Sequence, residues 1–189
     1  MKRVAYAWAR LTGWTFAGVL PDEPRYIVIG APHTSNWDFV IFLAALHHFD
    51  IHARFLGKHT LFRWPFGRFF EGLGGIPVDR SRAGGVVAQV ATVFEATEKM
   101  VLVIAPEGTR KAGRWWKSGF LSIAEAADVP VVPAGIDYLT KTVALGDAIS
   151  FDGDVRPFMD RLRAFYTDKR GRHPELESPV AVREELKGS

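Results

Sequence analysis

Apolar residues along the chain form short continuous runs, separated by stretches in which they recur every three or four positions. The continuous runs are typical of strands that are covered on both faces, and the wider spacing is the period of a helix. We therefore predict strands at residues 26–31, 51–57, 75–78, 100–105, 129–137 and 148–151, and helices at residues 37–48, 65–71, 83–97, 118–127 and 157–166.

This alternation predicts a single α/β domain with a mostly parallel β-sheet flanked by helices. A strand, a helix and a further strand of the same sheet normally form a right-handed crossover that leaves both strands pointing the same way. The carboxyl ends of such strands meet at one edge, where open α/β sheets place their ligand sites. The polar residues directly after each strand are therefore the first candidates for a functional site.

Length and composition limit the chemistry. The chain has 189 residues, and nearly half of them are hydrophobic. Residues 1–189 therefore fit one domain with a substantial core. The absence of cysteine excludes disulfides, thiolate nucleophiles and cysteine-ligated zinc, and no cluster of His and Asp suggests another metal. The net charge of +3 and the pI near 9.3 favour an anionic partner without identifying it.

The chain carries no predicted membrane span. Its longest uninterrupted apolar run, residues 39–46, has eight residues, whereas a spanning helix needs about 20. We therefore expect a cytosolic or peripheral protein.

After the first predicted strand, residues 32–38 read Pro-His-Thr-Ser-Asn-Trp-Asp and lead into a helix. Ser35 and Asp38 fit a capping box, in which both side chains bond backbone amides at a helix start. A carboxylate in the first helical turn can also face back toward His33, fix its tautomer and support the imidazolium ion. The two interpretations are compatible, and the second makes His33 a candidate general base.

Charged residues follow three other predicted strands at the same edge. Arg80 follows residues 75–78, Glu107 and Arg110 follow residues 100–105, and Lys58 follows the second strand. Two arginines from separate strand ends, joined by a lysine, would bind a phosphate group. Each of these cations also fits a solvated surface charge, and Glu107 fits an internal ion partner as well as a substrate contact.

Four blocks of sequence together carry a resemblance to a known family. They are His33 with Asp38 five residues on, Gly-Gly-Ile-Pro-Val-Asp-Arg at 74–80, Pro-Glu-Gly-Thr-Arg at 106–110, and Val-Pro-Val-Val-Pro at 129–133. In this order and spacing they resemble the motifs of the glycerolipid acyltransferase family, which includes the bacterial 1-acylglycerol-3-phosphate acyltransferases. The resemblance spans roughly residues 25–140.

The resemblance implies an α/β acyltransferase that moves a fatty acyl group from acyl-CoA or acyl carrier protein to a hydroxyl of a lipid acceptor, of the lysophosphatidate type. It implies His33 as general base and Asp38 as the residue that orients it. The acceptor site would be lined by Lys58, Arg80, Glu107, Gly108, Thr109 and Arg110, and residues 131–133 would shape the acyl-side wall.

The sequence departs from the family pattern at two positions. Pro32 stands where a small polar residue is common, and Lys111 stands where serine is common. The nearby Trp115 and Trp116 are bulky for a lysophosphatidate pocket. These departures leave the acceptor's identity open.

An alcohol becomes a good nucleophile when a base removes its proton, and the ordinary pKa of a histidine, ~6.5, suits that task. The chain has no Gly-x-Ser-x-Gly elbow, no cysteine and no Ser-x-x-Lys that could carry an acyl-enzyme. We therefore expect direct attack on the thioester, with no metal or cofactor beyond the thioester co-substrate. Amides at the start of the helix after His33 are candidates to stabilise the developing negative charge.

Two segments mix aromatic and basic residues as an interfacial helix does. One lies within residues 1–20, where Val4, Tyr6, Trp8, Leu11 and Trp14 accompany Lys2, Arg3 and Arg10; the other is Phe62, Trp64, Phe66, Phe69 and Phe70 with Arg63 and Arg68. Both sets also fit a core or the cover of an acyl tunnel. The membrane interpretation predicts a peripheral protein on the cytoplasmic face of the membrane.

Two other functions compete with this one. Residues 110–117, Arg-Lys-x-x-Arg-Trp-Trp-Lys, resemble a single-strand nucleic-acid surface, in which cations flank stacking aromatic rings. That function would leave His33 and Asp38 without a role, so we expect no nucleic-acid partner. A lipid or thioester hydrolase that uses the same pair to activate water is the nearer alternative.

Overall fold

Strand β2 (Arg25–Ala31) is a central strand in the computed structural model, which describes residues 1–58, 62–63, 67–72, 74–78 and 85–188. Its side chains alternate between two apolar clusters, with Ile27 and Ile29 on one face and Tyr26 and Val28 on the other. Strands β5 (Met100–Ile104) and β6 (Val131–Asp137) pair with its two edges. Because both faces are covered, the segment is almost continuously apolar.

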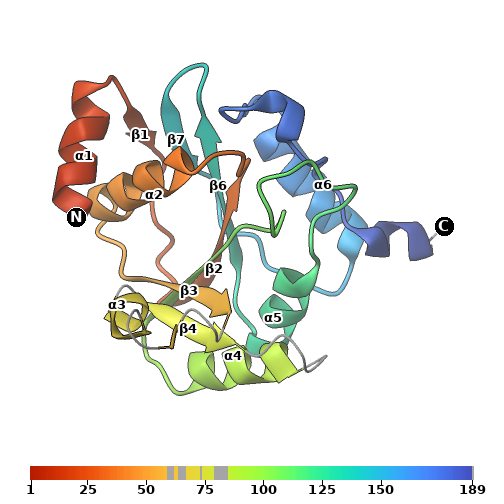
Figure 1. Ribbon diagram of the computed structural model, residues 1–189. Coiled ribbons are helices and arrows are strands. Elements are labelled where there is room, and N and C mark those ends of the chain that lie inside the picture. Colours follow the sequence, from red (N-terminus) through yellow and green to blue (C-terminus); the bar gives the residue numbers. More distant parts are fainter. Residues whose placement is uncertain (59–61, 64–66, 73, 79–84, 189) are drawn as a thin grey trace.

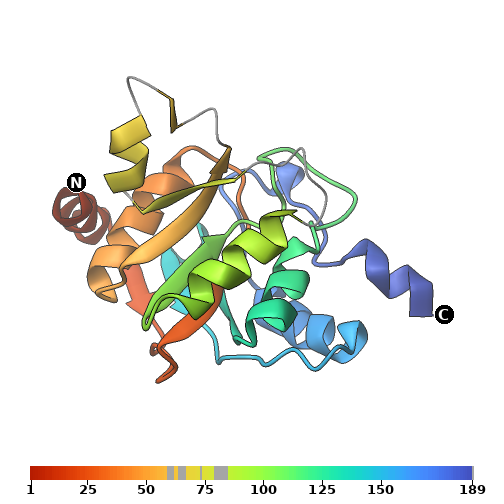
Figure 2. The same cartoon turned by 90° about the horizontal axis from the view of Figure 1, so that it is seen from below.

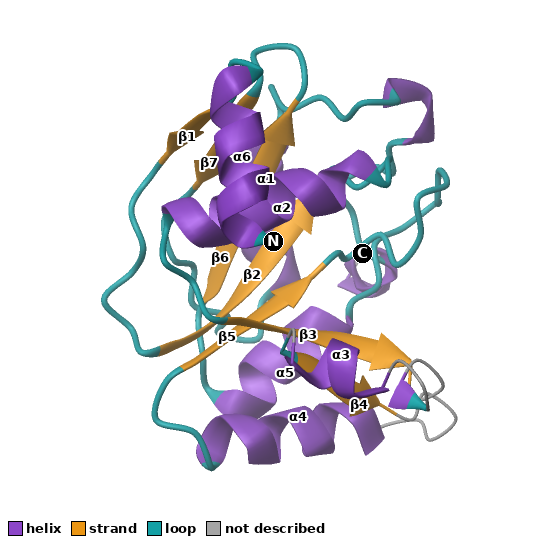
Figure 3. Cartoon of the chain, turned by 60° about the vertical axis from the view of Figure 1, so that its left-hand side comes forward, coloured by secondary structure: helices purple, strands orange, loops and turns teal. Residues whose placement is uncertain are grey.

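The described strands form a seven-stranded sheet with the order β1-β7-β6-β2-β5-β3-β4 (Figure 3). The remaining members are β1 (Thr15–Ala17), β3 (Ala53–Lys58), β4 (Gly75–Val78) and β7 (Thr142–Leu145). Every neighbouring pair is parallel except β6 with β7. The predicted α/β domain with a mostly parallel sheet is therefore confirmed.

Helices cover both faces of this sheet (Figures 1 and 2). On one face α4 (Gly85–Glu95), α5 (Gly119–Ala127) and α6 (Val155–Tyr166) contribute Phe94, Phe120 and Met159 to the largest apolar cluster. On the other face α1 (Lys2–Leu11) packs on α2 (Trp37–His48) through small side chains such as Ala9 and Ala44. The short helix α3 (Gly67–Gly72) contacts β4, and two 3-10 turns, η2 (Pro174–Leu176) and η3 (Arg183–Gly188), follow α6.

The prediction of a strand at residues 148–151 is wrong. Only one isolated bridge, between Ile149 and Val131, forms there. The antiparallel partner of β6 is instead β7, which follows a tight turn closed by Asp137, whose carboxylate accepts hydrogen bonds from the amides of Leu139 and Thr140. Because this turn reverses the chain directly after β6, the next strand of the sheet lies at Thr142–Leu145, before the predicted range.

The parallel strands β2, β5 and β3 end at the same edge of the sheet, as the crossover rule predicts. Strand β6 runs parallel to β2 and ends there too. This edge carries the loop at residues 32–36, the loop at residues 105–110 and Tyr138. The fold thus gathers residues that are far apart in the sequence.

Candidate active site

His33 lies in the loop that leaves β2, and Asp38 lies in the first turn of α2. Nδ1 of His33 is 3.1 Å from Oδ2 of Asp38. The Asp38 side chain is buried, whereas 28% of the His33 side chain is exposed. A buried carboxylate therefore contacts an imidazole ring that a substrate can reach.

The Asp38 carboxylate accepts hydrogen bonds on both oxygens. Oδ2 accepts from the amides of Thr34 and Ser35 at 2.9 and 2.8 Å, and Oδ1 accepts from the Tyr138 hydroxyl at 2.7 Å. Burial raises the pKa of Asp38, but the hydrogen bonds from His33, Tyr138 and the Ser35 amide outweigh it and hold that pKa below its ordinary value. The ionised carboxylate only accepts, so Nδ1 of His33 donates and Nε2 is left to accept a proton.

Both interpretations of residues 35–38 are compatible with the structure. Oγ of Ser35 accepts from the Trp37 amide at 3.2 Å, and Asp38 reaches back to the Ser35 amide as in a capping box. The same carboxylate contacts His33. The amides of residues 34, 35, 37 and 38 are all engaged within this loop, so they do not meet our expectation of free donors for a developing negative charge.

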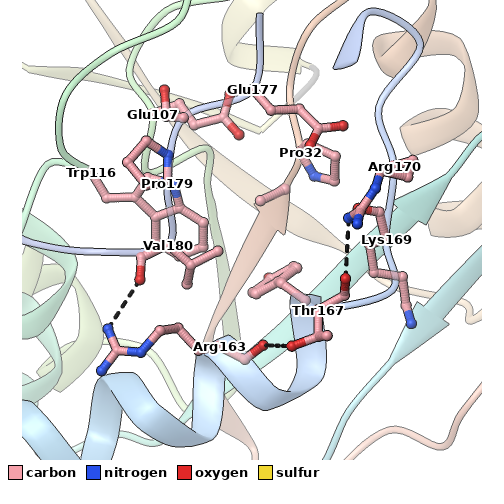
Figure 4. Close-up of a pocket in the computed structure, with 13 residues that line it drawn as sticks. Pro32, Glu107, Trp116, Arg163, Thr167, Lys169, Arg170, Glu177, Pro179 and Val180 are labelled. Atoms are coloured by element: carbon pink, nitrogen blue, oxygen red, sulfur yellow. Dashed lines mark hydrogen bonds between the residues drawn. The ribbon is translucent and has the colours of Figure 1, made fainter. Parts of the chain in front are cut away.

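Glu107 holds the backbone of the histidine loop. Its buried carboxylate accepts from the His33 amide with both oxygens, at 3.0 and 3.1 Å. Burial raises the pKa of Glu107 to about 7, although the hydrogen bond from the His33 amide lowers it. Glu107 and Glu177 line a cavity of about 300 Å³ between the sheet edge and α6, with Lys169 and Arg170 on another side (Figure 4). Glu107 thus faces a different cavity from the other polar residues of its motif.

A second cavity, of about 640 Å³, is lined in part by His33. Its volume is in the range of small-molecule sites. The walls are mainly apolar and come from β3, β5 with the residue after it, α4 and α5: Leu56, Val86, Val87, Val103, Ile104, Ala105, Phe120 and Ile123. Gly108, Thr109, Arg110 and Lys117 add polar and basic groups. The imidazole ring of His33 and the cations Arg110 and Lys117 therefore share a cavity whose apolar walls suit an apolar chain.

The structure brings four of the predicted site residues to this cavity, namely His33, Gly108, Thr109 and Arg110, while Asp38 lies behind the histidine. Lys58 ends β3, but its side chain lies outside the described structure, and Arg80 lies outside the described residues altogether. Residues 131–133, expected at the acyl-side wall, do not line this cavity; Val131 and Val132 are buried on opposite faces of the sheet.

Trp115 and Trp116, which follow the Pro-Glu-Gly-Thr-Arg block, do not line the cavity at His33, although the sequence suggested that they would crowd the site. Trp116 is buried in the main apolar cluster, edge-on to Tyr166. The Arg114 guanidinium stacks over the Trp115 ring at 5.4 Å. Because Trp116 is enclosed, it cannot act as the base-stacking platform that a nucleic-acid surface would require.

Sequence reasoning missed Tyr138 and Glu177. Tyr138 directly follows β6, so the same rule that selected the residues after the other strands also points to it. No comparable signal marks Glu177, which comes from an irregular segment after η2. In the part of the chain that the structure describes, no group of three His, Asp or Glu side chains is placed to hold a metal ion.

Together, the mostly parallel sheet and the buried carboxylate behind an accessible histidine define an α/β protein with a His–Asp pair beside a mainly apolar cavity. The model of the family described as Acyltransferase matches residues 15–137 of the sequence. The match covers more than half of the chain, which therefore belongs to this acyltransferase family, and the predicted family is confirmed.

Among solved structures, the chain is similar to the 1-acyl-sn-glycerophosphate (LPA) acyltransferase PlsC from Thermotoga maritima. The TM-score is 0.58 at 17% sequence identity, over 88% of this chain and 75% of that chain. At this identity the similarity establishes the fold. None of the curated proteins is similar enough in sequence to count as a match.

Proposed function

We propose that this acyltransferase moves a fatty acyl group from acyl-CoA or acyl carrier protein to a hydroxyl of a lysophosphatidate-type lipid. The observation that supports this most is the mainly apolar cavity that His33 helps to line. An acyl chain bound there would hold its thioester carbonyl near the imidazole ring. The PlsC enzyme of the same fold acts on 1-acyl-sn-glycerophosphate, which favours a phosphorylated lipid acceptor.

In the proposed reaction, Nε2 of His33 takes the proton of the acceptor hydroxyl as its oxygen attacks the thioester carbonyl carbon. The carbon–sulfur bond then breaks, and the imidazolium returns the proton to the leaving thiolate. Asp38 stabilises the imidazolium between these two events. Arg110 and Lys117, which line the same cavity, would neutralise the charge on the carbonyl oxygen or on the acceptor's phosphate.

Gly119 offers a test of the acyl cavity. It lies in the cavity wall at the start of α5, and a Cβ added there meets nothing within 4 Å, so a larger side chain enters open space. Gly119→Phe should therefore shorten the preferred acyl chain. Excluding two methylene groups from burial costs about 1.6 kcal/mol, so the ratio of kcat/KM for long and short donors should fall roughly 15-fold.

The measurement is kcat/KM for a series of thioesters of increasing chain length, in the wild type and the variant. Gly72→Phe is the matched control, because Gly72 also has open space around its Cβ but lines a different cavity. The acyl assignment of the cavity fails if both variants retain the wild-type chain-length profile.

We also propose that helix α1 contacts the membrane peripherally, on the cytoplasmic side. Val4 and Leu11 are 74% and 87% exposed, and Arg3 and Arg10 beside them are exposed too. Residues seven positions apart lie on the same face of a helix, so α1 presents apolar and basic side chains together, which suits an anionic lipid surface. Among the described helices, none is long and apolar enough to span a bilayer.

The structure changes which aromatic residues belong to this surface. Trp14 is only 4% exposed and packs edge-on against Tyr138, so it is a core residue rather than a membrane anchor. Trp8 stacks on Trp37 of α2. Of the second aromatic segment, Trp64 and Phe66 and the side chains of Phe69 and Phe70 lie outside the described structure.

Replacing both Val4 and Leu11 with serine should reduce the fraction of protein that sediments with vesicles of phosphatidylcholine and phosphatidylglycerol. These two side chains supply apolar area that would be buried in the lipid interface. Leu186→Ser is the control, since Leu186 is also exposed but lies in η3, far from α1 in Figure 1. Equal sedimentation of the double variant and the wild type would remove α1 from the membrane-binding surface.

A further inference from the structure

Tyr138 contacts the oxygen of Asp38 that His33 does not use. Its hydroxyl donates to Oδ1 at 2.7 Å, while Nδ1 of His33 lies 3.1 Å from Oδ2. The amides of Thr34 and Ser35 also bond Oδ2. The carboxylate is therefore held from two sides, by the histidine loop on one oxygen and by the end of β6 on the other.

Tyr138 itself is firmly placed. Its amide donates to the Arg170 carbonyl at 2.8 Å, and the adjacent Asp137 carboxylate accepts from the Arg170 amide at 3.2 Å. The buried indole of Trp14 packs edge-on against the phenol ring, with centroids 5.0 Å apart. The backbone and the ring are thus both fixed, so the hydroxyl has a defined direction toward Asp38.

A donor on Oδ1 has two effects on the pair. It opposes rotation of the carboxylate, which keeps Oδ2 next to the His33 ring. It also draws negative charge away from Oδ2, so the imidazolium is held less strongly and returns its proton more easily to the leaving group. Both effects act through Asp38, because the contact of Tyr138 in this network is with that carboxylate.

We propose that Tyr138 is a positioning residue of the acyl-transfer site, which orients Asp38 and moderates its hold on the protonated His33. The proposal rests on the proposed role of His33 and Asp38 as the general-base pair. In this proposal Tyr138 contacts neither the acyl donor nor the acyl acceptor. Its effect should therefore appear in turnover and in the pH dependence, and not in the KM of either substrate.

Tyr138→Phe keeps the ring and removes only the hydroxyl. Without that donor, Asp38 holds the imidazolium more strongly, so the acid limb of the kcat–pH profile should move to higher pH. Above this limb, kcat should fall on the order of tenfold, as expected for the loss of a hydrogen bond to a charged group. Among the described residues, the other charged groups around the network are Glu107, from the loop after β5, and Arg172, from the segment after α6. Arg110 and Lys117 line the same cavity as His33. None of these four groups is altered in the variant.

Two variants separate positioning from a structural role. Tyr166→Phe is the matched control, because its buried hydroxyl donates to the Ile29 carbonyl at 2.6 Å and its loss should lower thermal stability without moving the acid limb. In an Asp38→Ala background, Tyr138→Phe should cause no further loss of kcat, since its partner is already gone. If Tyr138→Phe lowers kcat by the same factor in the Asp38→Ala background as in the wild type, the proposal is overturned.

Proton NMR of the imidazole N–H of His33 tests the same contact without any substrate. The wild type should show a downfield signal that His33→Ala and Asp38→Ala both lose, that Tyr138→Phe shifts, and that Tyr166→Phe leaves in place. If Tyr138→Phe has the wild-type signal and the wild-type acid limb, Tyr138 does not position the pair. If the wild type transfers no acyl group to any hydroxyl, the proposed function fails, while the signal still decides the role of Tyr138.

Discussion

Replacing His33 with alanine should reduce acyl transfer by at least ~100-fold and leave the domain folded, because general-base catalysis contributes roughly 10² to 10⁴. The partly exposed ring lies at the edge of the sheet, outside the apolar clusters, so its removal should leave the core intact. The backbone amide that holds Glu107 is retained in the variant. The measurement is kcat/KM for transfer from an acyl thioester, together with the thermal unfolding temperature.

His52→Ala is a suitable control for this loss. His52 is an exposed histidine at another cavity, on the side of α2 and β3, so its replacement should leave transfer unchanged. A folded His33→Ala protein with activity close to that of the wild type would rule out His33 as the base.

Arg110→Ala should produce the second largest effect, on transfer to a phosphorylated acceptor. Arg110 lines the same cavity as His33, and a charge-assisted hydrogen bond to phosphate is worth roughly 1.5 to 3 kcal/mol. Its loss should lower kcat/KM for that acceptor by ~10 to 150-fold. If the contact is equally strong in the ground and transition states, the change should appear mainly in the acceptor's KM.

CoA carries phosphates of its own, so the donor in this experiment should be a truncated pantetheine thioester. Lys111→Ala is the matched control, because Lys111 is the adjacent exposed cation and does not line the cavity. An uncharged acceptor provides the second comparison. Equal losses for the phosphorylated and uncharged acceptors would show that Arg110 does not recognise the phosphate.

The sequence predicted the central strands and the sheet edge because both depend on local patterns. Buried parallel strands such as β2 are continuously apolar, and the crossover rule then places the residues after each strand at one edge. His33 and Asp38 are only five positions apart, so their contact depends on one turn at the start of α2. These features could be predicted without knowledge of the rest of the fold.

The features that the sequence did not predict depend on distant parts of the chain. Trp14 and Trp116 are core residues because of the elements that pack over them, and an aromatic residue among cations carries no local sign of burial. The contact between Tyr138 and Asp38 joins residues 100 positions apart, and no periodicity records it. Glu107 is the glutamate of the Pro-Glu-Gly-Thr-Arg block. Its hydrogen bond with the His33 amide depends on how two distant loops pack together, which the sequence does not record.

The fate of a labelled acyl group tests the central claim most directly. Purified protein is mixed with a labelled acyl thioester, with and without 1-acylglycerol-3-phosphate, and the label in lipid ester, free fatty acid and protein is measured over time. Direct transfer by His33 and Asp38 predicts that label enters the lipid ester only when the acceptor is present, with none on the protein. Free fatty acid formed without acceptor at a comparable rate would indicate a hydrolase, and label bound to the protein would contradict direct attack on the thioester.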